Sequence, residues 1–567
     1  MLRAWCLAHA LCALATSRTV FQPDEHWQSL EIAHGIVFGY GYRTWEWTGK
    51  TPIRSIVHPA SFVPLYAFLQ ACGLDASTFI MTTLPAIQQA LISAVGDACA
   101  FGLVQRIAGR RAAWCWAFLH MSSLYWMFTA TRTFSNTLEA ALCSMALSAW
   151  PLCTADVQRL ASGPARRAYR LALLAAFTAV LVRPTSLVIW SFLGLKLLWD
   201  AHSDAQGLWR VVREPLWIGP FVLGLGACAD YMYFGVWTLA PLRFFLQNVI
   251  HGVSSFYGEN AWHWYITLGL PTILSVYLPF FFRGIYVTYK KAVSAQVRTL
   301  LSMCAWTVAI FSLLAHKEVR FLQPLVPWFH FAAAIGMADS RPMNISSLRT
   351  AFQALPRWMR AWIYAQLPFF VYLTAFHTQG QVGVTTHMHR VATSSKAPVT
   401  VGFLMPCHST PWQSHMHFAP WGSGGDRGRA WFLACPPPPD AHLSDYWDQS
   451  DFFFADPLQY MHSRFPATVD PSFPAMDRSK FIVPLTTGLP RAHAAYDLGW
   501  AHPWPSHFVM FSNLLKTGNE TMSIAELLTA QGYRETARLW NSVFHPEEHR
   551  RGNVVVWSHY SRDALAS

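Results

Sequence analysis

Residues 298–338 read RTLLSMCAWTVAIFSLLAHKEVRFLQPLVPWFHFAAAIGMA. Two apolar runs, 298–315 and 321–338, are separated only by the charged link at 316–320. Each run is close to the roughly 20 residues that an α-helix needs to cross the hydrocarbon core of a bilayer. The stretch therefore predicts two membrane-spanning helices with a cluster of ionisable side chains at one membrane edge.

Similar apolar runs recur along the 567 residues, of which 53% are hydrophobic and 13% charged. This composition excludes an ordinary soluble domain and predicts a mainly α, polytopic transmembrane helical bundle of about 11 spans. The first span is expected to reach about Val20; a cleaved signal peptide is the alternative, but Ser17-Arg18-Thr19 is a poor cleavage site. The proline-containing run 55–74 is expected to be re-entrant or interfacial. The other expected spans are 85–105, 113–130, 137–152, 169–183, 185–201, 215–232, 265–283, 298–315, 321–338 and 361–377.

The net charge of +12 is distributed as in a membrane protein and not as in a nucleic-acid-binding protein. With a cytosolic N-terminus, the cytosolic loops contain most of the arginines and lysines, as the positive-inside rule requires. No further span follows residue 377. We therefore expect a transmembrane domain over 1–377, with a luminal catalytic loop at 21–54, and a luminal C-terminal domain of α/β type over 378–567. The other segments expected on the luminal side are 131–136, 233–264 and 316–320.

The first luminal segment is rich in carboxylates. Asp24 and Glu25 stand where the first span leaves the bilayer, a costly place for acids that neither bind nor react with anything. Glu31 follows two turns later on the same helix face. These residues are candidates for acid–base chemistry. A structural role is the alternative, because Pro23 and two acids are also typical of the start of a helix.

Aromatic residues are concentrated in two of the luminal segments. Trp45 and Trp47 lie in the first, and Trp262 and His263 lie in a later one. Trp and Tyr at a membrane surface usually form an interfacial belt, but aromatic rings also suit the faces of a sugar. The sequence leaves both interpretations open.

The link between the two spans of 298–338 contains three cations or potential cations, His316, Lys317 and Arg320. Each of them loses solvation at the bilayer edge. Such a group suits a lipid phosphate, whose negative charge grows as its bond to a sugar breaks. Snorkelling membrane anchors are the alternative. Arg183, which precedes a proline on the luminal side, is a further candidate for a phosphate contact.

The C-terminal part contains two features of an oxidising lumen. Cys407 and Cys435 are its two cysteines and could form a disulfide there. Asn519-Glu-Thr521 is the candidate glycosylation site, because the other sequon, Asn344-Ile-Ser346, faces the cytosol in this topology. The chain has no zinc-like Cys/His spacing and no luminal Asp-x-Asp, so no metal site is expected.

Pro23-Asp24-Glu25, together with His316-Lys317-Glu318-Val319-Arg320-Phe321, resembles glycosyltransferase family 22. Its members are membrane-embedded mannosyltransferases of the C-type fold that use dolichyl-phosphate mannose in the lumen of the endoplasmic reticulum. The family usually has Glu or Phe where Val319 stands. Further strings resemble the branch that adds the third, α-1,2-linked mannose to the glycosylphosphatidylinositol (GPI) lipid: 22–31, 42–47, 256–258 with 262–264, and 404–411.

The resemblance implies an inverting single displacement, with Asp24 as the base and Glu25 as the alternate. It assigns the donor phosphate to His316, Lys317 and Arg320, with Arg183 more distant, and so implies no cofactor and no metal. The substrates would be dolichyl-phosphate mannose and the GPI glycolipid precursor in the membrane. Residues with a candidate role in binding the acceptor or a sugar are Glu31, Trp45, Trp47, Trp262, His263 and His408.

Two other functions remain open. The first is the sister α-1,2-mannosyltransferase that acts on the dolichol-linked oligosaccharide with the same fold and donor. The second is a lipid transporter or scramblase, since many spans with intramembrane charge suit either. Transporters more often show paired repeats and broken midplane helices, whereas here the charges gather at one membrane face.

Overall fold

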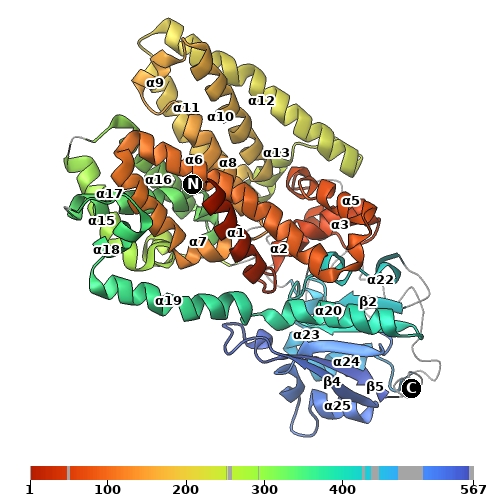
Figure 1. Ribbon diagram of the computed structural model, residues 1–567. Helices are drawn as coiled ribbons and strands as arrows, with labels where there is room; N and C mark the ends of the chain where they lie inside the picture. The colour runs from red at the N-terminus through yellow and green to blue at the C-terminus, as the bar shows by residue number, and fades with distance from the viewer. Residues whose placement is uncertain are drawn as a thin grey trace. The chain divides into compact units, whose positions relative to one another are not determined.

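The computed structural model describes residues 2–47, 52–250, 252, 258–291, 293–341, 343–423, 428–435, 446–469 and 502–560. It divides into two compact units, a helical one and an α/β one (Figure 1). The helical unit comprises residues 1–14, 50–58 and 86–370, and the α/β unit comprises 15–49, 59–85 and 371–567. The first polar segment thus groups with the C-terminal part, whereas the predicted division at residue 377 assigned it to the transmembrane domain.

The helical unit is built mainly from α-helices. Its helices are α1 (Leu2–Thr16), α6 (Thr78–Met121), α7 (Leu124–Thr129), α8 (Ser135–Ala149), α9 (Thr154–Arg159), α10 (Gly163–Val182), α11 (Leu187–Ala201), α12 (Ala205–Phe234), α13 (Ala240–Phe245), α14 (Leu270–Leu274), α15 (Leu278–Lys290), α16 (Ala295–Leu313), α17 (Val326–Ser340), α18 (Leu348–Ala354) and α19 (Arg357–Ala375). The 3₁₀ helix η8 (Val319–Leu325) begins within the charged link at 316–320, and α17 follows it directly.

Helix α6 reverses direction at Gly109, which has φ 85° and ψ 168°. Asp97 and His120 lie 23 residues apart, which in a straight helix is roughly 35 Å. Their side chains are nevertheless 3.1 Å apart, between Oδ1 and Nε2. The helix is therefore an antiparallel hairpin, and its turn falls between the predicted spans 85–105 and 113–130.

By length and composition, five helical stretches of the described residues can cross a membrane. They are Thr78–Met121, Ala205–Phe234, Tyr265–Lys290, Ala295–Leu313 and Val319–Ser340. Other helices at predicted spans are shorter, among them α1, α8 and α11 with 15 residues each. The count of about 11 spans stays a prediction. The run 55–74 contains the short helices α4 (Val57–Ala60) and α5 (Val63–Ala71), and its re-entrant or interfacial position stays a prediction.

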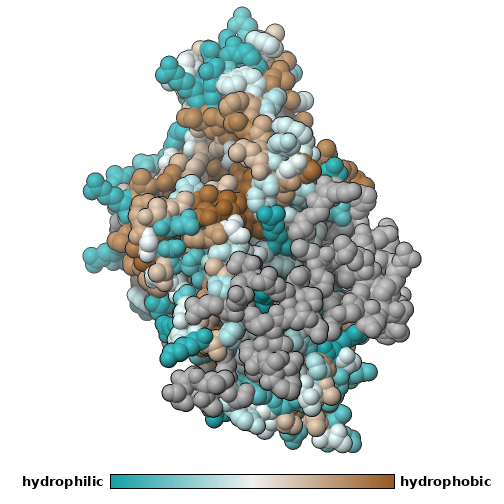
Figure 2. Space-filling model, turned by 90° about the vertical axis from the view of Figure 1, so that its right-hand side faces the viewer, coloured by the Kyte–Doolittle hydropathy of each residue, from teal (hydrophilic) through white to brown (hydrophobic). Residues whose placement is uncertain are grey.

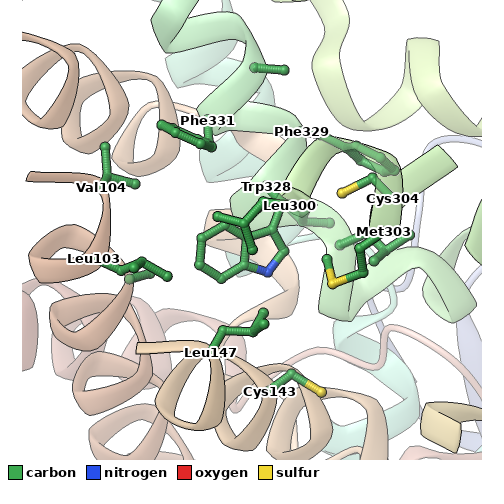
Figure 3. Packing of buried hydrophobic residues seen from close by; sticks show 14 of the residues in the cluster. Leu103, Val104, Cys143, Leu147, Leu300, Met303, Cys304, Trp328, Phe329 and Phe331 are labelled. Atoms are coloured by element: carbon green, nitrogen blue, oxygen red, sulfur yellow. The ribbon is translucent and has the colours of Figure 1, made fainter. Parts of the chain in front are cut away.

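Small residues allow α15 and α17 to pack closely. A Cβ atom on Gly284 would lie 1.8 Å from the Ala332 carbonyl oxygen, and one on Gly336 would lie 2.0 Å from that of Phe280. Close backbone approach through glycines is typical of helix pairs in membranes. Beside this contact, the fully buried Trp328 of α17 packs among side chains of α6, α8 and α16 (Figure 3).

Large apolar side chains also cover the outside of the helical unit (Figure 2). On α12 alone, Leu216, Trp217, Phe221, Leu225 and Met232 are exposed. Apolar surface of this extent marks an interaction site, and on helices of this length and composition lipid is the expected partner.

The α/β unit contains a five-stranded mixed sheet in the order β2-β1-β3-β5-β4, which confirms the predicted α/β type (Figure 1). Strand β1 pairs in parallel with β2 and β3, whereas β5 is antiparallel to β3 and β4. The strands are β1 (Val399–Leu404), β2 (Gly428–Phe432), β3 (His507–Phe511), β4 (Tyr533–Leu539) and β5 (Val554–His559).

Side chains alternate between two cores on opposite faces of this sheet, as the period of a strand requires. Phe508 and Met510 of β3 enter one core with α23 (Gln449–Ala455), α24 (Pro457–Arg464) and α25 (Ile524–Ala530). Val509 and Phe511 enter the other core with α20 (Gln379–Ser394), α21 (Gln413–Met416) and Trp27 of the first segment. The first segment is thus part of the fold of the α/β unit.

Cys407, just after β1, and Cys435, just after β2, form a disulfide with Cα atoms 5.9 Å apart, a pairing that the sequence left open. It closes a loop of 28 residues. By chain entropy, closing such a loop stabilises the fold by about 3.6 kcal/mol. The bond fixes the start of the loop that contains His408.

Candidate active site

Asp24 opens the short helix α2 (Asp24–Trp27), which follows Pro23. Its Oδ1 atom lies 3.3 Å from Nδ1 of His408, and the Asp24 side chain is 34% exposed. The structure thus pairs the predicted base with a histidine 384 residues away. A partly exposed carboxylate beside an imidazole can accept a proton from a substrate hydroxyl.

The imidazole of His408 is fixed from several sides. It stacks on the indole ring of Trp27 with centroids 4.5 Å apart, and Trp27 donates Nε1–H to the carbonyl of Thr410 at 3.0 Å. The backbone of His408 is left-handed, with φ 56°, a conformation rare for residues other than glycine and often found at functional sites. The disulfide at Cys407 holds this turn in place.

Glu25, the alternate base, has different surroundings. Its residue is 2% exposed, and its Oε2 atom accepts a hydrogen bond from the backbone N–H of Phe21 at 3.3 Å. A buried carboxylate that caps the chain before its own helix is poorly placed to meet an acceptor. Of the two predicted bases, the geometry favours Asp24.

Glu31 of α3 (Leu30–Phe38) is also buried, at 1% exposure. Its carboxylate accepts hydrogen bonds from the backbone N–H groups of Tyr42 at 3.0 Å and Ser414 at 2.8 Å. Burial raises the pKa of Glu31 to about 7, against the lowering effect of these hydrogen bonds. Glu31 therefore holds the first segment against the 412–416 turn and is not placed for the predicted direct contact with a sugar.

The two tryptophans of the first segment lie in the 3₁₀ helix η1 (Trp45–Trp47). Trp47 is 2% exposed, so burial also argues against its predicted sugar contact. Trp45 is half-buried and keeps part of its ring accessible.

Close to Glu31 lies a histidine cluster that the sequence did not reveal. His34 Nε2 lies 2.9 Å from His417 Nδ1, and the Tyr40 hydroxyl lies 3.2 Å from the same nitrogen. Asp75 Oδ2 is 3.7 Å from His417 Nε2. Burial and the neighbouring His417 lower the pKa of His34 to about 3, so its ring is neutral at physiological pH. These residues come from distant parts of the chain, so no local spacing in the sequence indicates the cluster.

In the helical unit, the link at 316–320 is held together by Glu318. The Glu318 carboxylate lies 3.2 Å from His316 Nε2 and 2.6 Å from Arg320 Nε. Burial alone would raise the pKa of Glu318, but the positive charge of Arg320 and the hydrogen bond from His316 outweigh it and lower the pKa to about 2. The same hydrogen bond raises the pKa of His316. In the link, the carboxylate of Glu318 thus orients both the imidazole of His316 and the guanidinium of Arg320.

Lys317 does not share this arrangement. It is 3% exposed, and its ammonium donates to the carbonyls of Asn260 at 2.7 Å, Ala315 at 3.5 Å and Leu314. An ammonium has three N–H donors, so the carbonyls account for all of them. The predicted phosphate contact of Lys317 is therefore replaced by a structural role in which it braces the link.

Arg183 lies beside the link. Its guanidinium is 5.5 Å from the ring of Phe321 and pairs with Glu139, with Nε 3.3 Å from Oε2. Arg54 lines the same small cavity as Arg183, although no motif in the sequence marks it. The structure therefore places Arg183 close to the predicted phosphate site, with its charge already balanced.

The predicted sugar-binding pair of the later luminal segment is accessible. Trp262 is 67% exposed, and His263 next to it is also exposed. They follow Asn260, whose carbonyl binds Lys317. The Phe256-Tyr257 part of the resemblance lies outside the described residues.

Cys407, His408 and Cys435 lie close enough together for a metal site, with ligand atoms within 4.8 Å of one another. Both cysteines are used in the disulfide, and metal binding needs thiolates. This donor set therefore does not fit a metal ion.

The fold defines the class of protein. It is similar to the structure of ArnT from Cupriavidus metallidurans bound to undecaprenyl phosphate, with a TM-score of 0.58 over 98% of this chain and 97% of that one. The identity is 13%, so this likeness concerns the fold alone. Residues 3–417 match the model of the Alg9-like mannosyltransferase family. The chain belongs to this family and is a mannosyltransferase.

Two curated relatives are similar to this chain in sequence. GPI mannosyltransferase 3 of Yarrowia lipolytica is 33% identical over 98% of this chain and 96% of its own length. GPI alpha-1,2-mannosyltransferase 3 of Homo sapiens is 32% identical over 79% of this chain and 74% of its own length. The family resemblance inferred from the acidic and cationic motifs is confirmed.

Proposed function

We propose that this mannosyltransferase adds the third mannose to the GPI precursor, in α-1,2 linkage, with dolichyl-phosphate mannose as the donor in the lumen of the endoplasmic reticulum. The proposal rests on the Asp24–His408 pair in a chain whose relatives over nearly its full length include GPI mannosyltransferase 3. The distribution of basic loops supports the orientation, in which the first polar segment and the 316–320 link each face the lumen.

On the acceptor side, Asp24 acts as the base. An inverting reaction proceeds by a single displacement, so one carboxylate must take the proton of the acceptor hydroxyl as that hydroxyl attacks the anomeric carbon. His408 orients the Asp24 carboxylate at 3.3 Å, and Trp27 and the disulfide keep His408 in place. A carboxylate held in this way needs no rearrangement at the moment of reaction.

On the donor side, His316 and Arg320 bind the phosphate of the dolichyl donor. Negative charge accumulates on this phosphate as its bond to mannose breaks, and fixed cations at the bilayer edge stabilise that charge. Glu318 keeps both cations in position, and Lys317 holds the backbone of the link. These side chains take the part that a metal ion plays in many nucleotide-sugar enzymes.

Complementation tests the choice of acceptor. In cells lacking the third GPI mannosyltransferase, we expect the wild-type chain to restore GPI-anchored proteins at the surface and Asp24→Asn to fail at matched expression. Glu548→Gln, which changes an exposed carboxylate of the α/β unit, is the matched control and should restore them. Rescue of a mutant in the dolichol-linked oligosaccharide pathway, without rescue of the GPI mutant, would establish the sister activity instead.

A further inference from the structure

A cavity of about 580 Å³ lies in the α/β unit, on the opposite side of the sheet from His408. Its apolar part comprises Phe454, Leu458 and Leu514. The rings of Phe454 and His549 pack together with centroids 4.6 Å apart. The volume is within the usual range for small-ligand sites. Polar lining residues are Asp456, Gln459, His462, Asn513, Thr517, Asn519 and His549.

This mixture of side chains suits a carbohydrate. Aromatic rings offer flat faces for the C–H surface of a pyranose, and amides, imidazoles and carboxylates offer donors and acceptors for its hydroxyl and acetamido groups. Gln459, His462 and His549 are exposed at the rim. A ligand with one apolar face and a polar edge would satisfy both parts of the lining.

Asn519, the first residue of the sequon, forms part of the cavity wall. Its Oδ1 atom accepts hydrogen bonds from the Thr521 hydroxyl at 2.7 Å, the Thr521 backbone N–H at 3.0 Å and the Met522 N–H at 2.9 Å. These three bonds fix the oxygen of the carboxamide and with it the position of Nδ2, the atom to which an N-glycan is attached. Asn519 and Thr521 are both exposed.

We propose that Asn519 carries an N-glycan whose first N-acetylglucosamine occupies this cavity and packs on Phe454 and His549. In the attachment step, Asn519 Nδ2 bonds to C1 of the sugar and loses one proton. The C1–O bond to a lipid pyrophosphate donor breaks, and the pyrophosphate leaves with the electron pair. The cell's luminal oligosaccharyltransferase catalyses this step, with a lipid-linked oligosaccharide as the donor. The inference rests on the luminal orientation in the proposed function.

The occupied cavity would join two elements that are distant in sequence. The sugar would contact α24 and the residue before it on one side and the 513–519 turn on the other. The glycan would thereby stabilise the part of the α/β unit that packs against the sheet through Leu458 and Leu514.

Two glycosidases distinguish an occupied cavity from a glycan that only projects into solvent. On the native full-length protein, endoglycosidase H leaves one N-acetylglucosamine on Asn519, whereas peptide N-glycosidase F removes the whole glycan and leaves an aspartate at position 519. Hydrogen exchange is then measured for peptides covering 454–462 and 513–523. We expect several-fold slower exchange in the product that retains one sugar, because that sugar still fills the cavity.

Two variants complete the test. His549→Ala changes a rim residue outside the sequon and should make the two products exchange equally, whereas Lys516→Ala, which changes an exposed neighbour outside the lining, should behave as the wild type. Equal exchange of the two wild-type products would overturn the inference and leave the mannosyltransferase proposal intact. A wild-type protein whose mobility on a gel is unchanged by peptide N-glycosidase F would also overturn the inference. Transferase activity in the same preparation would show whether the reaction itself stands.

Discussion

Asp24 and Glu25 are adjacent in the sequence, yet the fold gives them different surroundings. Asp24 keeps a third of its side chain exposed beside His408, whereas Glu25 is buried and bonded to the chain that precedes it. The Pro-Asp-Glu motif alone does not separate them, since both acids fall in the first turn of α2. The separation comes from the 404–411 segment, which supplies the imidazole to only one of them.

Also at the residue scale, the pKa of Glu31 leads us to expect that the stability of the folded protein depends on pH. Its pKa in the folded protein is about 7, against about 4.3 in an unfolded chain. Between these values the folded protein holds a proton that the unfolded chain has lost, so stability should fall as the pH rises from about 4.3 to 7 and level off above. The full effect is on the order of 3 kcal/mol.

The check is thermal stability of the wild type and Glu31→Gln at pH 5 and pH 7.5. At pH 5, Glu31→Gln should be less stable than the wild type by about 1–2 kcal/mol, because an amide cannot accept from both backbone N–H groups. It should also lose the extra decline between the two pH values, whereas Glu548→Gln should retain it. An unchanged pH slope in Glu31→Gln would show that Glu31 does not titrate in this range.

The second prediction at the residue scale concerns the contribution of Lys317 to stability. Lys317→Met leaves the carbonyls of Leu314, Ala315 and Asn260 without their shared donor, and we expect a loss of about 3 kcal/mol in stability. The fraction of protein that remains monodisperse after heating measures this. Lys290→Met, at an exposed lysine of the same unit, should have no effect. If Lys317→Met is as stable as the wild type but binds the donor more weakly, Lys317 contacts the donor phosphate directly.

At the scale of elements, the pairing of α15 with α17 depends on two glycines. Gly336→Ala would place a methyl group 2.0 Å from the Phe280 carbonyl oxygen, so the helices must separate. We expect a loss of at least about 2 kcal/mol in stability. Gly224→Ala on α12 is the matched control, because a Cβ atom there meets nothing within 4 Å, and should be neutral or slightly stabilising. A heat-stability profile of Gly336→Ala equal to that of Gly224→Ala would contradict this packing.

The helices and the links between them also show which features of the fold could be predicted from the sequence. Apolar length marked the two arms of the α6 hairpin, and the pattern of charges marked the link, because both signals are local. The partners of individual side chains were not local. Glu31 meets Ser414, and His34 meets His417, across hundreds of residues. The sequence also offered no sign that Lys317 would turn to backbone carbonyls, since only the fold decides where an ammonium finds its acceptors.

For the whole molecule, we expect transfer of mannose that needs no divalent cation. The cations of the link are protein side chains, so membranes treated with EDTA and supplied with dolichyl-phosphate mannose should keep their rate. Activity is measured as labelled mannose transferred to the GPI precursor, before and after Mg²⁺ or Mn²⁺ is restored. A loss that either ion reverses would contradict the phosphate assignment to His316 and Arg320.

The most direct test of the central claim is transfer in microsomes from cells that lack the third GPI mannosyltransferase and express this chain. Labelled dolichyl-phosphate mannose is added, and the product lipids are separated. The account predicts that the wild type converts the two-mannose GPI precursor to a three-mannose product whose label α-1,2-mannosidase releases, and that Asp24→Asn is at least about 100-fold slower at equal protein level. Label that appears in dolichol-linked oligosaccharide instead, or an Asp24→Asn variant with the wild-type rate, would contradict it.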